Sequence, residues 1–498
     1  MLNDLAKAYQ STPDVVSLQL GDIILDGQLA PNAPVNLVLK SLNRHGLITG
    51  STGSGKTKTM QVLCEQLSQA GVPTLVMDIK GDISGLAMPG EPTEAILHRS
   101  QTMNLSYTPR QFSVELLTLD ESIAGVPLRS SITDFGALLL SRMLDLNDTQ
   151  AGVITILFEY AKDNHMPLID LSDFKQLLQF MQSEEGKTDI EQRYGNIAGS
   201  SIGSIMRKII ELESQGGQYF FGEPAFKVSD FIRVDNQGQG VISVLRLMDM
   251  QDKPQLFSTF MLKLLSDIYR EFPEVGDPNK PKLVLFIDEA HLIFNHASKA
   301  LLNTIDTIVK LIRSKGVGLV FCTQTPNDIP EAVLGQLGLK IQHALRAFTA
   351  KDRKAIKLVA QNFPPTDDYP IEDLLTSLSI GNALVTALDK NGQPTPLVQC
   401  QIRTPESRMG VLTDGEVNTL LNNSALYACY RQREDSFSAA DILMNRKKQQ
   451  TSEPMQKEQQ RTASSEQSII TILSKNTLVR QLVRDFFRGL LKLILGKK

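Results

Sequence analysis

One glycine-rich stretch restricts the fold of this chain more than any other part of it. Residues 46–57 read GLITGSTGSGKT, a short apolar run, a glycine turn and then the start of a stretch that favours helix. Glycines let successive backbone N–H groups point inward around a polyphosphate, and the N-terminus of the following helix attracts the same anion. The spacing G-x-x-x-x-G-K-T therefore predicts a phosphate-binding loop.

Each residue of this loop has an expected role toward ATP and Mg²⁺, the two ligands that the motif implies. Lys56 would place a positive charge near the β- and γ-phosphates, and the Thr57 hydroxyl would bind Mg²⁺. The candidate nucleotide contacts are the eight residues Gly50, Ser51, Thr52, Gly53, Ser54, Gly55, Lys56 and Thr57.

Length and charge limit the kinds of protein that this chain can be. Its 498 residues are too many for one core, so two or three folding units are expected. The net charge of −4 means that any contact with DNA must be local, for example in a pore. There is no basic head followed by an apolar core at the N-terminus, and no apolar run long enough to span a bilayer, so we expect a cytoplasmic protein. Cys64 and Cys322 lie in apolar runs and are expected to be buried thiols.

Strands and helices alternate after the loop in the manner of a parallel α/β sheet. A helical pattern over 58–70 is followed by the apolar strand candidate 73–78, which ends in a carboxylate. Ligands of such sheets bind beyond the carboxyl ends of the strands, so Lys80 and Asp82 of the sequence DIKGD lie either near the ligand or in an exposed turn. Further strand candidates are 112–119, 240–245, 283–287 and 317–324. Between the first and the second of these candidates, four helical patterns form an insert.

A second motif, KLVLFIDEAH over residues 282–291, ends a continuous apolar run with two carboxylates. Asp288 is expected to bind Mg²⁺ through its water shell. Glu289 should face another way, because successive side chains of a strand alternate, and it is the candidate that polarises the attacking water. Gln324 ends the next strand and would sense the γ-phosphate, unless it only forms a turn.

Two arginines near strand ends, Arg44 and Arg313, are candidates for an arginine finger supplied by a neighbouring subunit. From spacing alone, either could equally be a surface residue in a weak ion pair.

Taken together, five segments resemble the HerA–FtsK superfamily of P-loop ATPases, and in particular its YjgR-like branch of HerA-like helicase C-terminal proteins. These segments are NRHGLITGSTGSGKT, DIKGD, FIDEAH, LIRSKGVGLVFCTQ and VLGQLGLKIQHALRAFT. The likeness extends over about residues 16–445 and includes the helical insert with its FGEPAF segment.

The resemblance implies a RecA-like core and a hexameric ring with ATP bound between subunits. It assigns Lys56 and Thr57 to phosphate and Mg²⁺, Asp288 to the metal, Glu289 to the water and Gln324 to the sensor position. It assigns Arg313 to a finger that acts on the neighbouring site, with Arg44 as a second arginine. HerA proteins have a full β-barrel before the core, whereas only about 40 residues precede it here, which leaves the nuclease partnership typical of HerA in doubt.

The last part of the chain changes character twice. Residues 446–466 are polar and without apolar periodicity, as expected of a linker. Residues 467–498 carry apolar residues at every fourth position beside a stripe of arginines, which predicts a basic amphipathic helix. That helix could dock on the ATPase or another helix, lie on an anionic membrane surface, or contact nucleic acid.

The expected fold class is α/β, with a RecA-like core, a sheet of mainly parallel strands, an all-helical insert and the terminal amphipathic helix. The expected divisions are a short β segment over 1–40, core parts over 41–125 and 236–445, the insert over 126–235, the linker over 446–466 and the helix over 467–498. The expected function is Mg²⁺-dependent ATP hydrolysis by a hexamer that moves double-stranded DNA through its channel. The alternative is an ATPase switch or scaffold at the inner membrane face that acts on protein partners.

Overall fold

The computed structural model describes residues 2–248, 252–276, 278–296, 299–366 and 368–448, together with 481 and 484. Residues 1–436 form one compact unit and residues 437–498 a second. Apart from its first residues, the expected linker lies outside the described residues, as does nearly all of the amphipathic helix. Within the described part, no helix is both long and apolar enough to cross a membrane.

A single twelve-stranded sheet organises the first unit, in the order β2-β1-β12-β11-β10-β3-β9-β8-β4-β7-β5-β6. The strands from β10 to β6 in this order are all parallel to their neighbours. They are β3 (Gly46–Thr49), β4 (Thr74–Asp78), β5 (Val114–Thr118), β6 (Val126–Pro127), β7 (Ile242–Arg246), β8 (Leu283–Ile287), β9 (Val317–Thr323) and β10 (Leu339–Gln342). The expected sheet of mainly parallel strands is confirmed.

Four antiparallel strands extend the sheet beyond β10. They are β1 (Ser17–Leu25), β2 (Gln28–Val38), β11 (Asn382–Thr386) and β12 (Val398–Ile402). The two N-terminal strands therefore belong to the same sheet as the core, because β1 pairs with β12 and places Gly21 opposite Ile402. Gly21 is required there, since a Cβ atom would lie 1.9 Å from the carbonyl oxygen of Gln401.

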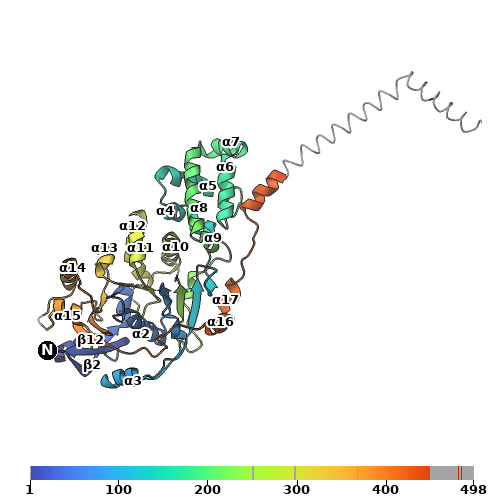
Figure 1. Cartoon of the computed structure of the whole chain (residues 1–498). Coiled ribbons are helices and arrows are strands. Elements are labelled where there is room, and N and C mark those ends of the chain that lie inside the picture. Colours follow the sequence, from blue (N-terminus) through green and yellow to red (C-terminus); the bar gives the residue numbers. More distant parts are fainter. Residues whose placement is uncertain are drawn as a thin grey trace, which may run out of the picture. The chain divides into compact units, whose positions relative to one another are not determined.

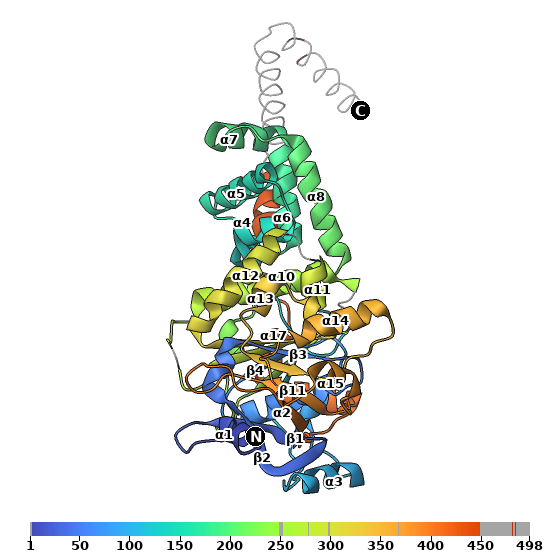
Figure 2. The same ribbon diagram turned by 90° about the vertical axis from the view of Figure 1, so that its left-hand side faces the viewer.

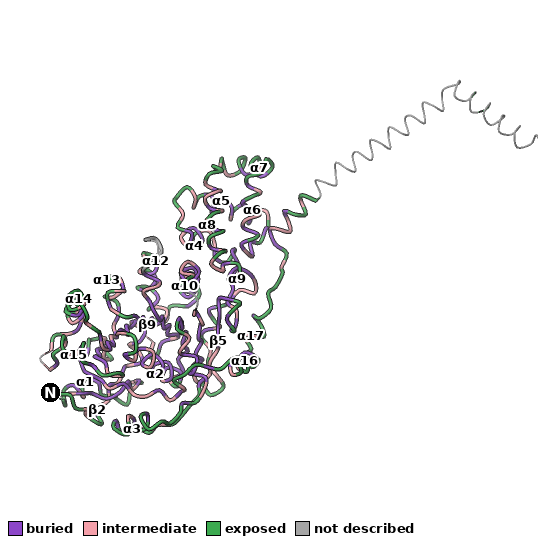
Figure 3. The backbone as a smooth tube through the Cα atoms, viewed as in Figure 1, coloured by how far each residue is buried: buried purple, intermediate pink, exposed green. Residues whose placement is uncertain are grey.

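Helices cover both faces of the sheet (Figures 1 and 2). α2 (Lys56–Gln69) lies on one face, and α10 (Pro254–Glu271), α11 (His291–His296) and α12 (Lys299–Ile312) lie on the other. The remaining helices outside the insert are α1 (Leu2–Ala8), α3 (Glu94–Thr102), α13 (Glu331–Leu334), α14 (Ala350–Ala360), α15 (Ile371–Ser377), α16 (Asp414–Asn423) and α17 (Ala425–Tyr430). The strands between these layers are buried (Figure 3), and Cys64 and Cys322 are buried as expected.

The helical insert stands on α10 and α12, on the side away from the sheet. It contains α4 (Ile132–Met143), α5 (Asp148–Asp163), α6 (Leu171–Gln182), α7 (Glu184–Tyr194), α8 (Gly199–Ser214) and α9 (Gly217–Phe220). The expectation that residues 126–235 are all helical is wrong at their start. β6 occupies Val126–Pro127 and pairs with β5 at the edge of the sheet, because two residues are too few to show a periodic pattern.

Candidate active site

The carboxyl edge of the parallel strands collects the candidate residues from segments far apart in the chain. β3 leads into the glycine loop, β8 ends just before Asp288, and β4 ends at Asp78. β9 lies between β3 and β8, and β4 follows β8. Neighbouring strands are about 4.8 Å apart, so the loop, the acidic pair and the turn after β4 share one side of the sheet.

The glycine loop has the backbone that a phosphate cradle requires. Gly50, Gly53 and Gly55 have φ angles of 151°, 78° and 116°, which side chains disfavour. α2 begins directly after them at Lys56, so its free N–H groups face the loop. The Ser54 hydroxyl is buried without a hydrogen-bond partner in the described part of the chain. The loop can therefore offer backbone N–H groups and a hydroxyl to a polyphosphate.

Lys56 is buried with its amine held at the loop. Its Nζ donates to the carbonyl oxygens of Gly50 at 2.5 Å and Ser51 at 3.2 Å. Burial lowers the pKa of Lys56, and the charge of Lys80 lowers it further, whereas Glu289 and Asp288 oppose the shift. Both lysines and both carboxylates thus lie within electrostatic range of one another, which supports a site for an anion accompanied by a cation.

Asp288 and Glu289 form the acidic side of the site. Asp288 is 3% exposed, and its Oδ2 has no hydrogen-bond partner among the residues that the structure describes. Burial raises the pKa of Asp288 to about 6, against the charge of Lys80. A buried carboxylate oxygen without a donor fits a divalent cation, and the half-buried Thr57 next to Lys56 can supply the second oxygen. The residues present therefore fit Mg²⁺ beside a nucleotide.

The sequence predicted that strand alternation sets the direction of Glu289. That reason does not hold, because β8 ends at Ile287, before Glu289. Its φ angle of 45° is left-handed, which is uncommon for a residue with a side chain. Glu289 Oε1 lies 2.5 Å from Lys80 Nζ, and Oε2 lies 3.2 Å from His291 Nδ1. The carboxylate thus faces the turn after β4.

The turn DIKGD after β4 contacts the acidic pair through Lys80. Asp78 caps the turn, since its Oδ1 accepts from the Gly81 N–H at 2.8 Å and its Oδ2 from the Ile83 N–H at 3.2 Å. The Lys80 side chain is 32% exposed and is paired with Glu289.

Gln324 follows the last residue of β9 and is exposed. It lines a cavity of about 510 Å³ together with Ser51 and Thr52 of the glycine loop. The structure therefore places the amide beside the start of the loop, where the sequence expected a γ-phosphate sensor.

A buried histidine that the sequence analysis missed supports the glycine loop. His343 follows β10, and its Nδ1 lies 3.0 Å from the carbonyl oxygen of Asn382, so Nδ1 donates. Nε2 then accepts from the Thr59 hydroxyl of α2 at 2.9 Å. A Cβ atom on Gly50 would lie 2.6 Å from the Cβ of His343. Burial lowers the pKa of His343 to about 4, so it stays neutral. The only sequence signal was a polar residue at a strand end.

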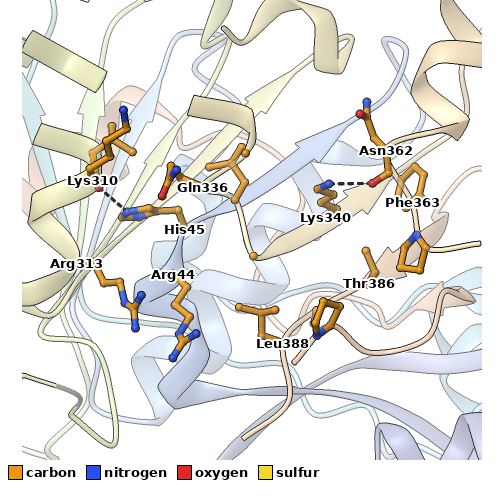
Figure 4. A pocket seen from close by; sticks show the side chains of 17 residues that line it. Arg44, His45, Lys310, Arg313, Gln336, Lys340, Asn362, Phe363, Thr386 and Leu388 are labelled. Atoms are coloured by element: carbon orange, nitrogen blue, oxygen red, sulfur yellow. Dashed lines mark hydrogen bonds between the residues drawn. The ribbon is translucent and has the colours of Figure 1, made fainter. Parts of the chain in front are cut away.

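Arg44 and Arg313 lie at the opposite edge of the sheet, where β3 and β9 begin. Arg44 belongs to the 3₁₀ turn Leu39–Arg44, and Arg313 begins the turn Arg313–Lys315. Both line a cavity of about 530 Å³ (Figure 4). Lys310 and Lys340 line it too, and no carboxylate is among the described residues that line it. Lys310 Nζ, however, is paired with Asp306 Oδ2 at 2.7 Å. The structure therefore brings the two arginines together in a cationic cavity and keeps them apart from the glycine loop of their own chain.

His45 fixes this arginine segment. Its Nδ1 accepts from the Leu319 N–H at 3.1 Å, so Nε2 carries the proton and donates to the Val309 carbonyl oxygen at 2.8 Å. Burial lowers the pKa of His45 to about 4. Through these two hydrogen bonds, the neutral His45 ring connects the segment that carries Arg44 to β9 and to α12, the helix that precedes Arg313.

Comparison with known proteins gives a family match over most of the chain. Residues 24–488 match the family described as helicase HerA-like C-terminal. The chain is 24% identical over 375 residues to the DNA double-strand break repair helicase HerA of Saccharolobus solfataricus, covering 74% of this chain and 66% of that protein. It is 21% identical over 392 residues to the protein of the same name from Sulfolobus acidocaldarius, covering 73% and 66%. The chain thus spans slightly less than two thirds of these relatives.

Among solved structures, the bacterial conjugative coupling protein TrwBdeltaN70 has the same fold. Its TM-score is 0.53 at 13% identity, and the match covers 82% of this chain and 95% of that chain. A second structure is titled plasmid coupling protein TrwB in complex with ADP and Mg²⁺, with a TM-score of 0.53, 13% identity, and coverage of 82% and 94%. These likenesses support the P-loop fold class.

Proposed function

The chain belongs to the helicase HerA-like C-terminal family, and from this premise we propose that it is a Mg²⁺-dependent ATP hydrolase that works as a hexamer and moves double-stranded DNA. The family match agrees with the resemblance expected from the motifs. One observation carries the proposal: a buried acidic pair shares a sheet edge with the glycine loop and Lys56, and one of its carboxylate oxygens has no hydrogen-bond partner among the described residues. A site of this composition holds a triphosphate and hydrolyses it.

Each residue has a role in this proposal. The loop from Gly50 to Gly55 binds the phosphates through its N–H groups, and Lys56 exchanges its carbonyl partners for phosphate oxygens. Thr57 and Asp288 would hold Mg²⁺, and the metal would neutralise charge on the phosphates. Glu289 accepts a proton from the attacking water, and the Gln324 amide orients that water.

Two arginines complete the site from a neighbouring copy in this proposal. Arg313 and Arg44 are at the amino edge of β9 and β3, and the glycine loop is at the carboxyl edge. A ring in which each copy presents its amino edge to the next copy's loop gives these arginines access to the terminal phosphate. Arg44, Arg313 and Lys340 line their cavity, and no carboxylate is among the described residues that line it, which suits an anionic ligand.

The nucleotide, the metal and the polymer are supported by different observations. A fold neighbour is titled as a complex with ADP and Mg²⁺. Asp288 Oδ2, which has no hydrogen-bond partner in the part of the chain that the structure describes, fits such a metal. Two relatives are named as DNA double-strand break repair helicases. The net charge of −4 restricts DNA to a local surface such as a channel.

The test is ATP turnover by the purified full chain with Mg²⁺, measured with and without duplex DNA. Turnover should rise when DNA is added, and Lys56→Ala should abolish it in both conditions. Normal hydrolysis by Lys56→Ala would overturn the site, whereas turnover that ignores DNA would overturn the translocase.

The second candidate function is a cytoplasmic ATPase switch or scaffold at the inner membrane face. The basic amphipathic pattern of residues 467–498 favours it. In that case turnover would be independent of DNA, and binding to anionic liposomes would be lost on deletion of 467–498. Liposome binding that survives the deletion would exclude this alternative.

A further inference from the structure

A second lysine, for which the proposed hydrolysis has no role, lies inside the acidic cluster. Lys80 Nζ is 2.5 Å from Glu289 Oε1, whereas Lys56 Nζ is held by loop carbonyl groups. The side chain of Lys80 is 32% exposed and that of Glu289 is 5% exposed. Lys80 is therefore the more accessible member of the pair, and it can turn toward a ligand while Glu289 remains in place.

The turn that carries Lys80 has a fixed geometry. Asp78 is 1% exposed and accepts hydrogen bonds from the N–H groups of Gly81, Asp82 and Ile83. Gly81 has a φ angle of 75°, and a Cβ atom there would lie 3.0 Å from Met248. The base of Lys80 is thus held at the end of β4, next to the strand of the acidic pair. Only its flexible side chain is free to change partners.

The charges around Lys80 belong to the nucleotide site itself. Burial alone would lower the pKa of Lys80, but the charges of Asp288 and Glu289 outweigh burial and raise it. Lys80 also lies close enough to Lys56 to lower the pKa of that lysine. Two lysine cations therefore converge on the region where Lys56 meets the β- and γ-phosphates.

The pairing also affects the water-activating carboxylate. An oxygen that accepts from a lysine at 2.5 Å has that lone pair engaged and is a weaker base for water. Glu289 is held in a left-handed backbone conformation with a φ angle of 45°, which costs energy unless surrounding contacts compensate. The ion pair with Lys80 is one such contact.

We propose that Lys80 is a γ-phosphate-binding residue that exchanges Glu289 for the terminal phosphate of a bound nucleoside triphosphate. The γ-phosphate carries more negative charge and more acceptor oxygens than one carboxylate, so it competes for the amine. When Lys80 turns to the phosphate, Oε1 of Glu289 becomes available to take a proton from water. A diphosphate lacks that group and leaves the pair intact. The proposal rests on the nucleotide site proposed above. It makes the triphosphate strengthen the base, since Glu289 Oε2 makes no hydrogen bond within the described residues and only Oε1 is held by Lys80.

The test compares binding of a non-hydrolysable ATP analogue with binding of ADP, both with Mg²⁺, by calorimetry on the full chain. Lys80→Met should lower the preference for the triphosphate over the diphosphate roughly 10- to 100-fold, because one charge-assisted contact is lost. Lys80→Arg should keep the preference. Glu289→Gln should raise it roughly two- to fivefold, because Lys80 no longer has to leave a carboxylate.

The double variant Lys80→Met/Glu289→Gln should behave as Lys80→Met alone, because the effect of Glu289 acts through Lys80. Lys175→Met is the matched control. Its ion pair with Glu213 has a distance of 2.6 Å and a lysine 29% exposed, but it lies in the helical insert. That variant should leave both affinities unchanged. If Lys80→Met fails to fold, Lys80→Gln keeps more of the polarity and gives the same comparison.

An unchanged preference in a folded Lys80→Met protein would overturn the inference, and so would a rise from Glu289→Gln that persists in the double variant. Equal loss of both nucleotides in a protein with normal thermal unfolding would also overturn it. Absence of nucleotide binding by the unmodified chain would instead refute the proposed function, so the two failures are distinguishable.

Discussion

Mixing two inactive variants tests whether Arg313 serves the site of a neighbouring copy. Lys56→Ala removes the phosphate contact and Arg313→Ala removes the expected finger, so each alone should lose turnover, by about 10³-fold or more for the arginine. In a mixed ring, an interface that pairs an intact Lys56 with an intact Arg313 should regain turnover. The recovery follows because each variant supplies the half of the site that the other lacks.

The structure explains why Arg313 would have to act on another copy, and random assembly gives the expected size of the recovered turnover. Arg313 lies just before β9 and Gln324 just after it, and β9 has seven residues. At about 3.3 Å per residue the two edges are roughly 20 Å apart, too far for Arg313 to reach the loop of its own chain. If the two variants assemble at random in equal amounts, about a quarter of the interfaces have both intact residues. Turnover should then reach about a quarter of the unmodified value.

The assay measures ATP turnover of the mixture after joint refolding or co-expression, with a different affinity tag on each variant to prove co-assembly. Each variant at the same total concentration is the control. A mixture that co-purifies through both tags yet shows only the sum of the separate activities would refute the shared site. Full turnover by Arg313→Ala alone would refute it as well.

The other predictions concern the loop and the metal. Gly50→Ala should destabilise the fold by about 2–5 kcal/mol, from backbone strain and from overpacking against His343. Gly53→Ala, whose new Cβ atom would have no described atom within 4 Å, should cost only about 1–2 kcal/mol. Equal losses of unfolding free energy for the two variants in urea would contradict the role of His343. Burial raises the pKa of Asp288 to about 6, and the charges of Lys80, Glu289 and Asp82 also act on this carboxyl group. Protons should therefore compete with Mg²⁺ for Asp288 below that pH. The apparent Mg²⁺ affinity of the nucleotide complex, titrated between pH 5 and 8, should fall about tenfold per unit below pH 6 and stay level above pH 7; a flat profile would contradict the assignment of Asp288.

The parallel half of the sheet could be predicted because its signals are local. Each expected strand is an apolar run closed by a turn, and the observed bounds of β4, β8 and β9 agree with the expected ranges within about one residue. Helices α2 and α10 carry the same kind of periodic signal.

The antiparallel half could not be predicted in the same way. β1 pairs with β12, a strand some 380 residues later, and no local pattern specifies that partner. β10 and β11 are four and five residues long and are separated by α14 and α15, so their pairing has no hairpin signal.

Residues of the candidate site whose position follows from a strand end could be predicted from the sequence. Residues whose position depends on contacts between distant side chains could not. Lys56 and Asp288 follow from the motif and the strand-end rule. The left-handed backbone of Glu289 and its pairing with Lys80 depend on how β4 and β8 adjoin. His343 is a buried support that contacts Thr59 across 284 residues of sequence, and a lone polar residue at a strand end does not reveal such a contact.

The most direct test of the central claim is to measure ATP binding and ATP turnover of Glu289→Gln in the same preparation. The claim is that the acidic pair after β8 breaks the triphosphate held by the loop at Lys56. The amide cannot accept the proton of water, so turnover should fall by about 10²–10⁴-fold, while Mg²⁺-dependent ATP binding stays at least as tight as in the unmodified chain. Turnover at the unmodified rate, or loss of ATP binding in a folded protein, would contradict the account.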